Sequence, residues 1–208
     1  MNDALRQLAD LTGWQGTATY SSTDWVAVER ELGLELPSDY KELLSTFPPG
    51  VYFAPNLRAG GVGVLPPRPY LDFPDHLHQF STVMDELREW RRDHPDDVPR
   101  PLFPEPGGMV PWAHSDGNEF LLWVREPGQS PQEWTVAVTN QGMWRPDDSN
   151  PVVEEFACSA TEFLVGVVSG AITSEVLARD MGELASLPPI PRRQPFVPLT
   201  EEEWNSED

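Results

Sequence analysis

Residues 32–44 read LGLELPSDYKELL, and this stretch predicts the helix around which we expect the chain to fold. Pro37 is tolerated in the first turn of a helix, and Asp39 favours the positive end of the helix dipole. Four apolar residues then recur at i, i+3, i+4 and i+7, namely Tyr40, Leu43, Leu44 and Phe47. This spacing puts them on one helix face, and Pro48-Pro49-Gly50 is expected to end the helix.

The residues before this stretch predict two shorter amphipathic helices. The first ends at Gly13 and has three leucines on one face: Leu5, Leu8 and Leu11. The second begins after Thr23 and ends at Gly33, and three apolar residues form its buried face: Trp25, Val28 and Leu32. Glycine at both ends fits the left-handed residue that commonly closes a helix.

A β-hairpin is predicted around Asp116-Gly117, because this dipeptide supplies the positive φ angles of a two-residue type I′ turn. Such a turn sets the register of the strands, with these opposing pairs: His114 and Glu119, Ala113 and Phe120, Trp112 and Leu121, Pro111 and Leu122, Val110 and Trp123. Both faces of the hairpin are then largely apolar. We therefore expect a central pair of strands that is covered on each face.

Shorter signals complete the predicted element list. Further strands are expected at 51–53, 62–65, 134–139, 143–145 and 152–156. Helices are expected at 82–92, where Thr82 and Asp85 form a capping pair, at 159–170, where Ser159 and Glu162 form a capping box, and at 174–181. The predicted fold class is α+β, with one domain and a mostly antiparallel central sheet of five to six strands packed with helices.

The domain is expected to span residues 1–185, with its core at about 20–170. From residue 186 onward, repeated prolines and the acidic run Glu201-Glu202-Glu203 predict an extended, solvated C-terminal tail over 186–208.

The chain is strongly acidic, with 34 Asp and Glu against 14 Lys and Arg and a formal net charge of −20. This charge repels phosphate backbones and anionic lipid, so neither nucleic acid nor a membrane is expected as a partner. It attracts basic proteins and speeds encounter with them, although solubility alone is an equally good reason for the charge. One cysteine, Cys158, and an N-terminus without a signal pattern predict a cytoplasmic protein.

Two ordered motifs resemble the SUKH superfamily, the Smi/Knr-type family. The first is the LG-x-x-LP-x-DY-K segment, with Leu32, Gly33, Leu36, Pro37, Tyr40 and Leu44; the second is a strand, Asp/Gly turn and strand, with Trp112, Asp116, Gly117 and Trp123. The resemblance covers roughly residues 20–170. One departure is the turn after the third helix, where Phe47-Pro48-Pro49-Gly50 replaces the usual small Gly-rich turn.

The resemblance implies a non-catalytic protein-binding module. Members of the superfamily are known as bacterial immunity proteins against polymorphic toxins, often nucleases or deaminases, and others are fungal and viral proteins that act by protein binding. We expect an immunity protein that holds a basic toxin domain as a monomer or weak dimer; a regulatory or scaffold protein with an endogenous partner is the alternative. Six residues are candidates for partner contact: Asp116, Glu119, Trp144, Glu201, Glu202 and Glu203. Trp144 fits a core position equally well.

No catalytic motif, cofactor fingerprint or metal signature stands out, so no catalytic residue, cofactor or metal is expected. Four residues have metal-ligand types, but a proline-rich solvated loop explains them better: Asp72, Asp75, His76 and His78. His114 opposite Glu119 lacks the third group that an acid–base site needs, so a structural pair is expected. Cys158 is expected to be a buried structural thiol. A set of arginines is expected to form local ion pairs with nearby acids: Arg88, Arg91 and Arg92.

Overall fold

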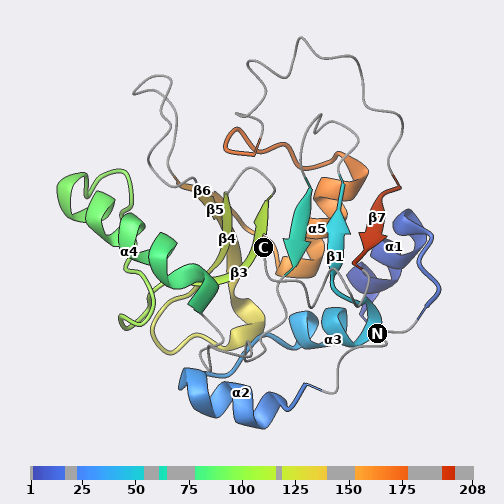
Figure 1. The fold of residues 1–208 in the computed structure, drawn as a ribbon, viewed down its shortest axis with the longest axis horizontal. Helices are drawn as coiled ribbons and strands as arrows, with labels where there is room; N and C mark the ends of the chain where they lie inside the picture. Colours follow the sequence, from blue (N-terminus) through green and yellow to red (C-terminus); the bar gives the residue numbers. More distant parts are fainter. Residues whose placement is uncertain are drawn as a thin grey trace.

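The computed structural model describes residues 2–16, 23–53, 61–64, 78–115, 119–139, 153–177 and 194–199, without the side chains of residues 78–83 and Glu86. Within these ranges the chain forms an α+β domain built on one antiparallel sheet of seven strands, in the order β6-β5-β4-β3-β2-β1-β7 (Figure 1). The strands are β1 Gly50–Tyr52, β2 Val62–Val64, β3 Val110–Ser115, β4 Phe120–Val124, β5 Thr135–Thr139, β6 Val153–Phe156 and β7 Phe196–Pro198. The predicted fold class is confirmed, with slightly more strands than expected.

Helices lie on both sides of this sheet. The described helices are α1 Asp3–Thr12, α2 Trp25–Leu32, α3 Ser38–Thr46, α4 His78–Asp93 and α5 Ala160–Ser169, with a 3-10 turn, η1, at Pro131–Glu133. Helices α1, α3 and α5 contact one another on one side, whereas α4 stands apart on the other (Figure 1). The predicted helix at 174–181 is a turn over residues 175–177, and the rest of that range lies outside the described residues.

The helix ends follow local chemistry that the sequence predicts well. Gly13 and Gly33 close α1 and α2 with φ of 68°, and the Ser159–Glu162 capping box opens α5 as expected. Helix α2 begins after Thr23 as predicted, and Asp24 caps it, since its carboxylate accepts from the Ala27 amide at 3.1 Å. One start differs. Helix α4 begins at His78, so the predicted capping pair at residues 82 and 85 lies inside the helix.

Leu11 is 36% exposed, although the leucine pattern predicts that it is buried. Leu5 and Leu8 are fully buried. Each step of three residues turns a helix position by about −60°. Two such steps therefore carry Leu11 out of the stripe that faces the core.

The hairpin register departs from the prediction at Trp112. Val110 pairs with Trp123 and Pro111 with Leu122 as expected, but the register then shifts, so that Ala113 opposes Leu121 and His114 opposes Phe120. The extra residue is a β-bulge, which puts Trp112 and Ala113 on the same face of the sheet. The predicted pairing of His114 with Glu119 is therefore wrong, because His114 lies opposite Phe120 and the Ser115 amide donates to the Glu119 carbonyl at 2.9 Å.

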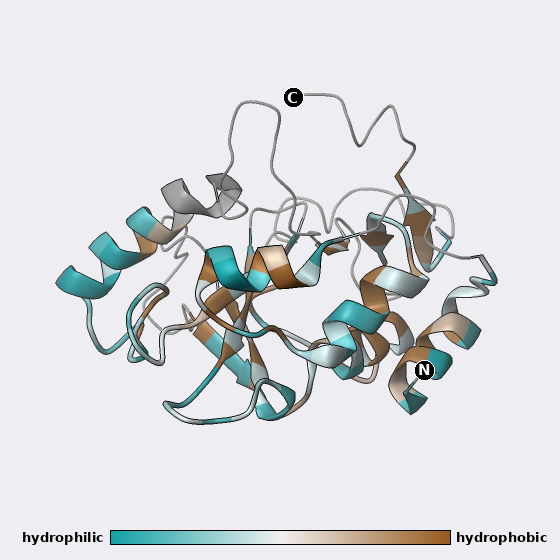
Figure 2. Cartoon of the chain, turned by 90° about the horizontal axis from the view of Figure 1, so that it is seen from below, coloured by the Kyte–Doolittle hydropathy of each residue, from teal (hydrophilic) through white to brown (hydrophobic). Residues whose placement is uncertain are grey.

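Apolar side chains fill both sides of the sheet, as the hairpin pattern predicts. The larger core lies between the sheet and helices α1, α3 and α5, and includes Trp112, Leu121 and Phe163. The smaller one lies under α4 and joins Leu87 to Leu122. In Figure 2 the described helices carry both hydrophilic and hydrophobic residues along their length, as amphipathic helices do. Every residue of β4 is buried, so the middle of the sheet is closed to partners from either side.

Strand β7 lies in the segment expected as a tail. Val197 pairs with Val51 and Phe196 with Tyr52, and the Phe196 side chain is 3% exposed. At least these residues beyond position 186 thus belong to the folded core. Glu201, Glu202 and Glu203 lie outside the described residues.

Candidate functional site

The two motifs meet in a buried aromatic cluster. Tyr40 of α3 packs edge-on against Trp123 of β4, with ring centroids 4.8 Å apart. Trp112 and Trp134 each lie 6.0 Å from Trp123, and Trp25 of α2 lies 5.9 Å from Tyr40. The remaining described motif residues support this contact: Leu36 and Leu44 are buried, Leu32 is partly buried, and Gly33 and Pro37 cap helices.

This cluster is built for packing and not for chemistry. Burial raises the pKa of the Tyr40 hydroxyl far above its usual range, so it cannot serve as an acid or base near neutral pH. Neither Trp25 nor Trp134 belongs to the two sequence motifs. Their positions beside apolar helix and strand patterns were the available signal, but the contact itself depends on the tertiary fold.

Most of the residues predicted to bind a partner lie outside the described ranges: Asp116, Trp144, Glu201, Glu202 and Glu203. Glu119 is described and is only 7% exposed. Its carboxylate accepts a hydrogen bond from the Ser115 hydroxyl, and its amide donates to the same hydroxyl oxygen at 3.2 Å. Glu119 thus holds the two strands together at the end of the hairpin.

Among the described residues, no three His, Cys, Asp or Glu side chains gather in a group that could hold a metal ion. Asp72, Asp75 and His76 lie outside the described ranges, and His78 begins α4. His114 lies over Gly63 on the neighbouring strand, and its Nδ1 is 3.2 Å from the Ser115 carbonyl oxygen.

Cys158 is half-buried after β6, and burial, with a smaller contribution from the Glu162 carboxylate, raises its pKa to about 11. The thiolate is the reactive form, so little of it exists near neutral pH. We expect iodoacetamide to modify the native protein at pH 8 at least ~10-fold more slowly than the urea-unfolded chain, whose thiol has a pKa of about 8.5. Mass spectrometry over time measures both rates.

Glu162→Gln is the matched variant, because glutamine also completes a capping box. It removes the negative charge and should speed native alkylation, with the helix unchanged. Equal rates for native and unfolded chains would contradict the burial of this thiol. The sign of the shift also means that folded-state stability falls as pH rises from about 8.5 towards 11, since the unfolded chain releases this proton first.

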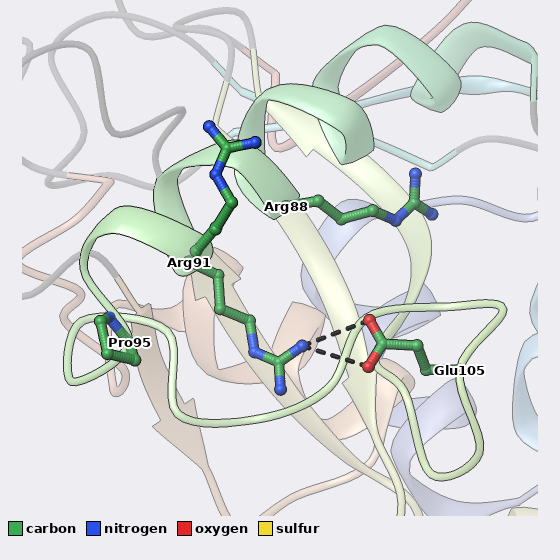
Figure 3. Close-up of a pocket in the computed structure, with 5 residues that line it drawn as sticks. Arg88, Arg91, Pro95 and Glu105 are labelled. Carbon is green, nitrogen blue, oxygen red and sulfur yellow. Dashed lines mark hydrogen bonds and ion pairs between the residues drawn. The ribbon is translucent and has the colours of Figure 1, made fainter.

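A hollow of about 390 Å³ lies beside the C-terminal half of α4, lined by Arg88, Arg91, Arg92, Pro95 and Glu105 (Figure 3). Arg91 contacts both Glu105 carboxylate oxygens at 3.2 Å, and Arg88 pairs with Asp85 and donates to the Phe103 carbonyl. Arg92 pairs with Glu89 and Asp93. Figure 3 shows the Arg88 and Arg91 side chains leaving the helix in different directions. The expected local ion pairing is confirmed for Arg88 and Arg92, whereas Arg91 pairs with Glu105 from a different segment, and the guanidinium groups do not converge on an anion site.

Ion pairs occupy most of the positive charges among the described residues. Arg100 shows this most clearly, because hydrogen bonds to Glu155 and Glu126 raise its pKa and connect strand β6 with the loop that follows β4. Other basic side chains in carboxylate contacts are Arg6, Lys41, Arg88, Arg91 and Arg92. Arg125 donates instead to the Gly108 carbonyl at 2.8 Å and lies over Trp134. The net charge of −20 is therefore carried by a surface whose described cations are mostly engaged.

In the part of the chain that is described, no helix has the length and apolar character needed to cross a bilayer. The family model described as SMI1 / KNR4 family (SUKH-1) matches residues 19–166, more than half of the chain. This range contains both motifs and the aromatic cluster that joins them. No curated protein and no solved structure matches the chain. Taken with the packing of Tyr40 against Trp123, the match places the chain in the SMI1/KNR4 family (SUKH-1).

Proposed function

We propose that this protein is an immunity protein that binds and neutralises a polymorphic toxin whose surface is basic, such as a nuclease or deaminase domain. The observation that carries the proposal is the charge of −20 on a fold whose described cations are largely ion-paired. The family supports a binding role, because SUKH domains are generally immunity-protein-like. An acidic surface of this kind competes with nucleic acid for a positively charged cleft.

Binding, in this proposal, uses the surface around a rigid core. The sheet is covered on both sides, so the partner contacts the outer faces of helices, the edges of strands and the connecting loops. Asp116 and Trp144 are proposed as direct contacts, and Glu201, Glu202 and Glu203 as additional charge. Glu119 is proposed to act indirectly, by holding Ser115 and the hairpin end that carries Asp116.

Co-expression tests the proposal directly. Each toxin-like gene encoded beside this one is induced in a bacterial host, with and without the full chain, and growth is followed. The proposal expects restored growth with one neighbour, together with a complex that co-purifies. Failure to rescue growth from any neighbouring toxin, with the full chain folded and abundant, counts against it.

Electrostatic attraction predicts strong salt dependence of the complex. Between about 50 and 500 mM NaCl the association rate constant should fall at least ~10-fold, because screening removes long-range steering, while the dissociation rate constant changes less. Surface plasmon resonance separates the two rates. A chain lacking residues 200–208 should keep its dissociation rate constant if the folded surface makes the contacts. A salt-independent association rate would show that charge does not drive the encounter.

The alternative is a regulatory or scaffold protein that binds an endogenous partner through the same kind of surface. Affinity capture from the native cell followed by mass spectrometry distinguishes the two. A toxin as the main captured protein supports immunity, whereas a chromosomal housekeeping protein with no toxic activity supports the alternative.

A further inference from the structure

Strand β7 pairs with the edge of β1, and Trp14, Phe47 and Tyr52 enclose its Phe196 side chain; the surface formed by these three residues and Gly50 is called the groove below. The Phe196 ring is 3% exposed and lies 5.4 Å from Trp14, 5.2 Å from Phe47 and 4.7 Å from Tyr52, measured between ring centroids. In Figure 1, β7 runs beside β1, with α1 close to it. Phe196 therefore fills this groove as a core residue does, although only a short strand carries it.

Backbone hydrogen bonds hold β7 along one edge. The Phe53 amide donates to the Pro195 carbonyl and the Leu199 amide to the Pro49 carbonyl, each at 2.9 Å, and Gly50 pairs with Pro198. Val197, between these points, is 40% exposed. Side chains of this segment thus alternate: the aromatic residue is enclosed and the next residue faces outward. The main chain contributes the hydrogen bonds to β1.

Gly50 lets β7 approach β1 closely, because it has no side chain at the point of contact. A Cβ atom at this position would lie 2.6 Å from Phe196 Cε2 and 2.6 Å from the Val197 carbonyl oxygen. Neither contact is possible without displacing the strand. The sequence suggests Gly50, after Pro48-Pro49, only as a helix stop. It is therefore also part of the surface against which β7 packs.

The groove and its occupant come from different parts of the chain. Phe47, Gly50 and Tyr52 lie within the family match at 19–166, whereas Trp14 and Phe196 lie outside it. Residues 178–193 separate β7 from the preceding described residues, so β7 is not the second strand of a short hairpin. Its docking is equivalent to the binding of a tethered peptide, favoured by a high effective concentration.

We propose that the edge of β1 is a binding groove for an extended peptide segment with an aromatic residue two positions before a proline. In the free protein β7 occupies it, and a partner protein that presents a segment of the same chemistry adds a strand in its place. This inference does not depend on the identity of the toxin or on the immunity role. In a bound peptide the aromatic side chain takes the enclosed position of Phe196, and the next residue, which faces outward, can be of any type.

The test uses the full chain with Phe196→Ala, which weakens β7 and leaves its groove intact. The probe is a fluorescein-labelled peptide with the sequence of residues 193–200, RQPFVPLT. Anisotropy should show the peptide binding to Phe196→Ala at least ~10-fold more tightly than to the unmodified chain, where the tethered strand competes. Val197→Ala is the matched control, because it shortens an outward-facing side chain of the same strand, and it should behave as the unmodified chain does.

Two further variants establish where the peptide binds. A peptide with alanine in place of phenylalanine should not bind, and Phe196→Ala combined with Gly50→Ala should lose binding of the normal peptide while its far-UV circular dichroism is retained. Absence of peptide binding to folded Phe196→Ala, or equal binding to Val197→Ala, overturns the proposal.

Hydrogen exchange on the unmodified chain gives a second measurement that needs no variant. The Leu199 and Phe53 amides, which bond across this edge, should exchange faster than the Leu121 amide at the centre of the sheet. Exchange of all three at the same slow rate would show that β7 leaves only with global unfolding, and would also overturn the proposal.

Discussion

Trp123→Ala is expected to cost about 3–5 kcal/mol of the free energy of unfolding, because it empties the middle of the aromatic cluster. Trp123 is 2% exposed and touches Tyr40, Trp112 and Trp134. The total free energy of unfolding of a protein is only about 5–15 kcal/mol. Urea titration followed by far-UV circular dichroism should therefore show a large shift of the midpoint to lower urea.

Val26→Ala is the control for this variant, since Val26 of α2 is 74% exposed and should change stability by no more than about 0.5 kcal/mol. If Trp123→Ala and Val26→Ala unfold at the same urea concentration, the cluster does not hold the two motifs together.

Gly108→Ala is expected to destabilise the protein by about 3 kcal/mol, at the upper end for overpacking, because the obstacle is main chain. A Cβ atom there would lie 2.4 Å from the carbonyl carbon of Leu102 and 2.5 Å from the amide nitrogen of Phe103. Both atoms belong to the bridge that pairs Leu102 with Met109, and the Gly108 carbonyl also accepts from Arg125. No rotamer change can relieve this clash.

Gly33→Ala separates this steric cost from backbone strain. Gly33 has φ of 68° and nothing within 4 Å of an added Cβ. Alanine there should therefore lower the free energy of unfolding by only about 1–2 kcal/mol, through backbone strain. The urea midpoints of the two variants, with hydrogen exchange of Leu102 and Met109, provide the comparison. A Gly108→Ala protein as stable as Gly33→Ala would mean that the bridge can open at little cost.

The helices could be predicted from the sequence because their signals are local. Tyr40, Leu43 and Leu44 repeat with helical spacing, and Ser159 and Gly170 mark the two ends of α5 through hydrogen bonds made within a few residues. Such rules need no knowledge of the tertiary fold. The α+β class and the family followed from these elements and from the hairpin.

The strand register could not be predicted in the same way. All five residues of β4 are apolar and buried, so polar alternation does not indicate which side each one faces. The Asp-Gly signal suggests a two-residue turn, but the bulge at Trp112 moves every pair closer to the turn by one residue. Glu119 consequently faces Ser115 and not His114, which changes a predicted surface charge into a buried hydrogen bond.

The groove of β7 was missed for a related reason. A strand of three residues, Phe196–Pro198, is too short to show an alternating pattern, and its partner on β1 lies far away in the sequence. Gly50 and Phe196 each had an ordinary local explanation. Only their close approach in space shows that they belong together.

The stacking of Trp112 on Trp123, with centroids 6.0 Å apart and planes 23° from parallel, also gives the protein an optical signature. Indole rings held at a fixed angle in a packed core give a near-ultraviolet circular dichroism band, which disappears when this packing is lost. A partner that binds the outside of the molecule leaves this band in place. The same spectrum can therefore distinguish a folded variant that no longer binds its partner from a variant that has unfolded.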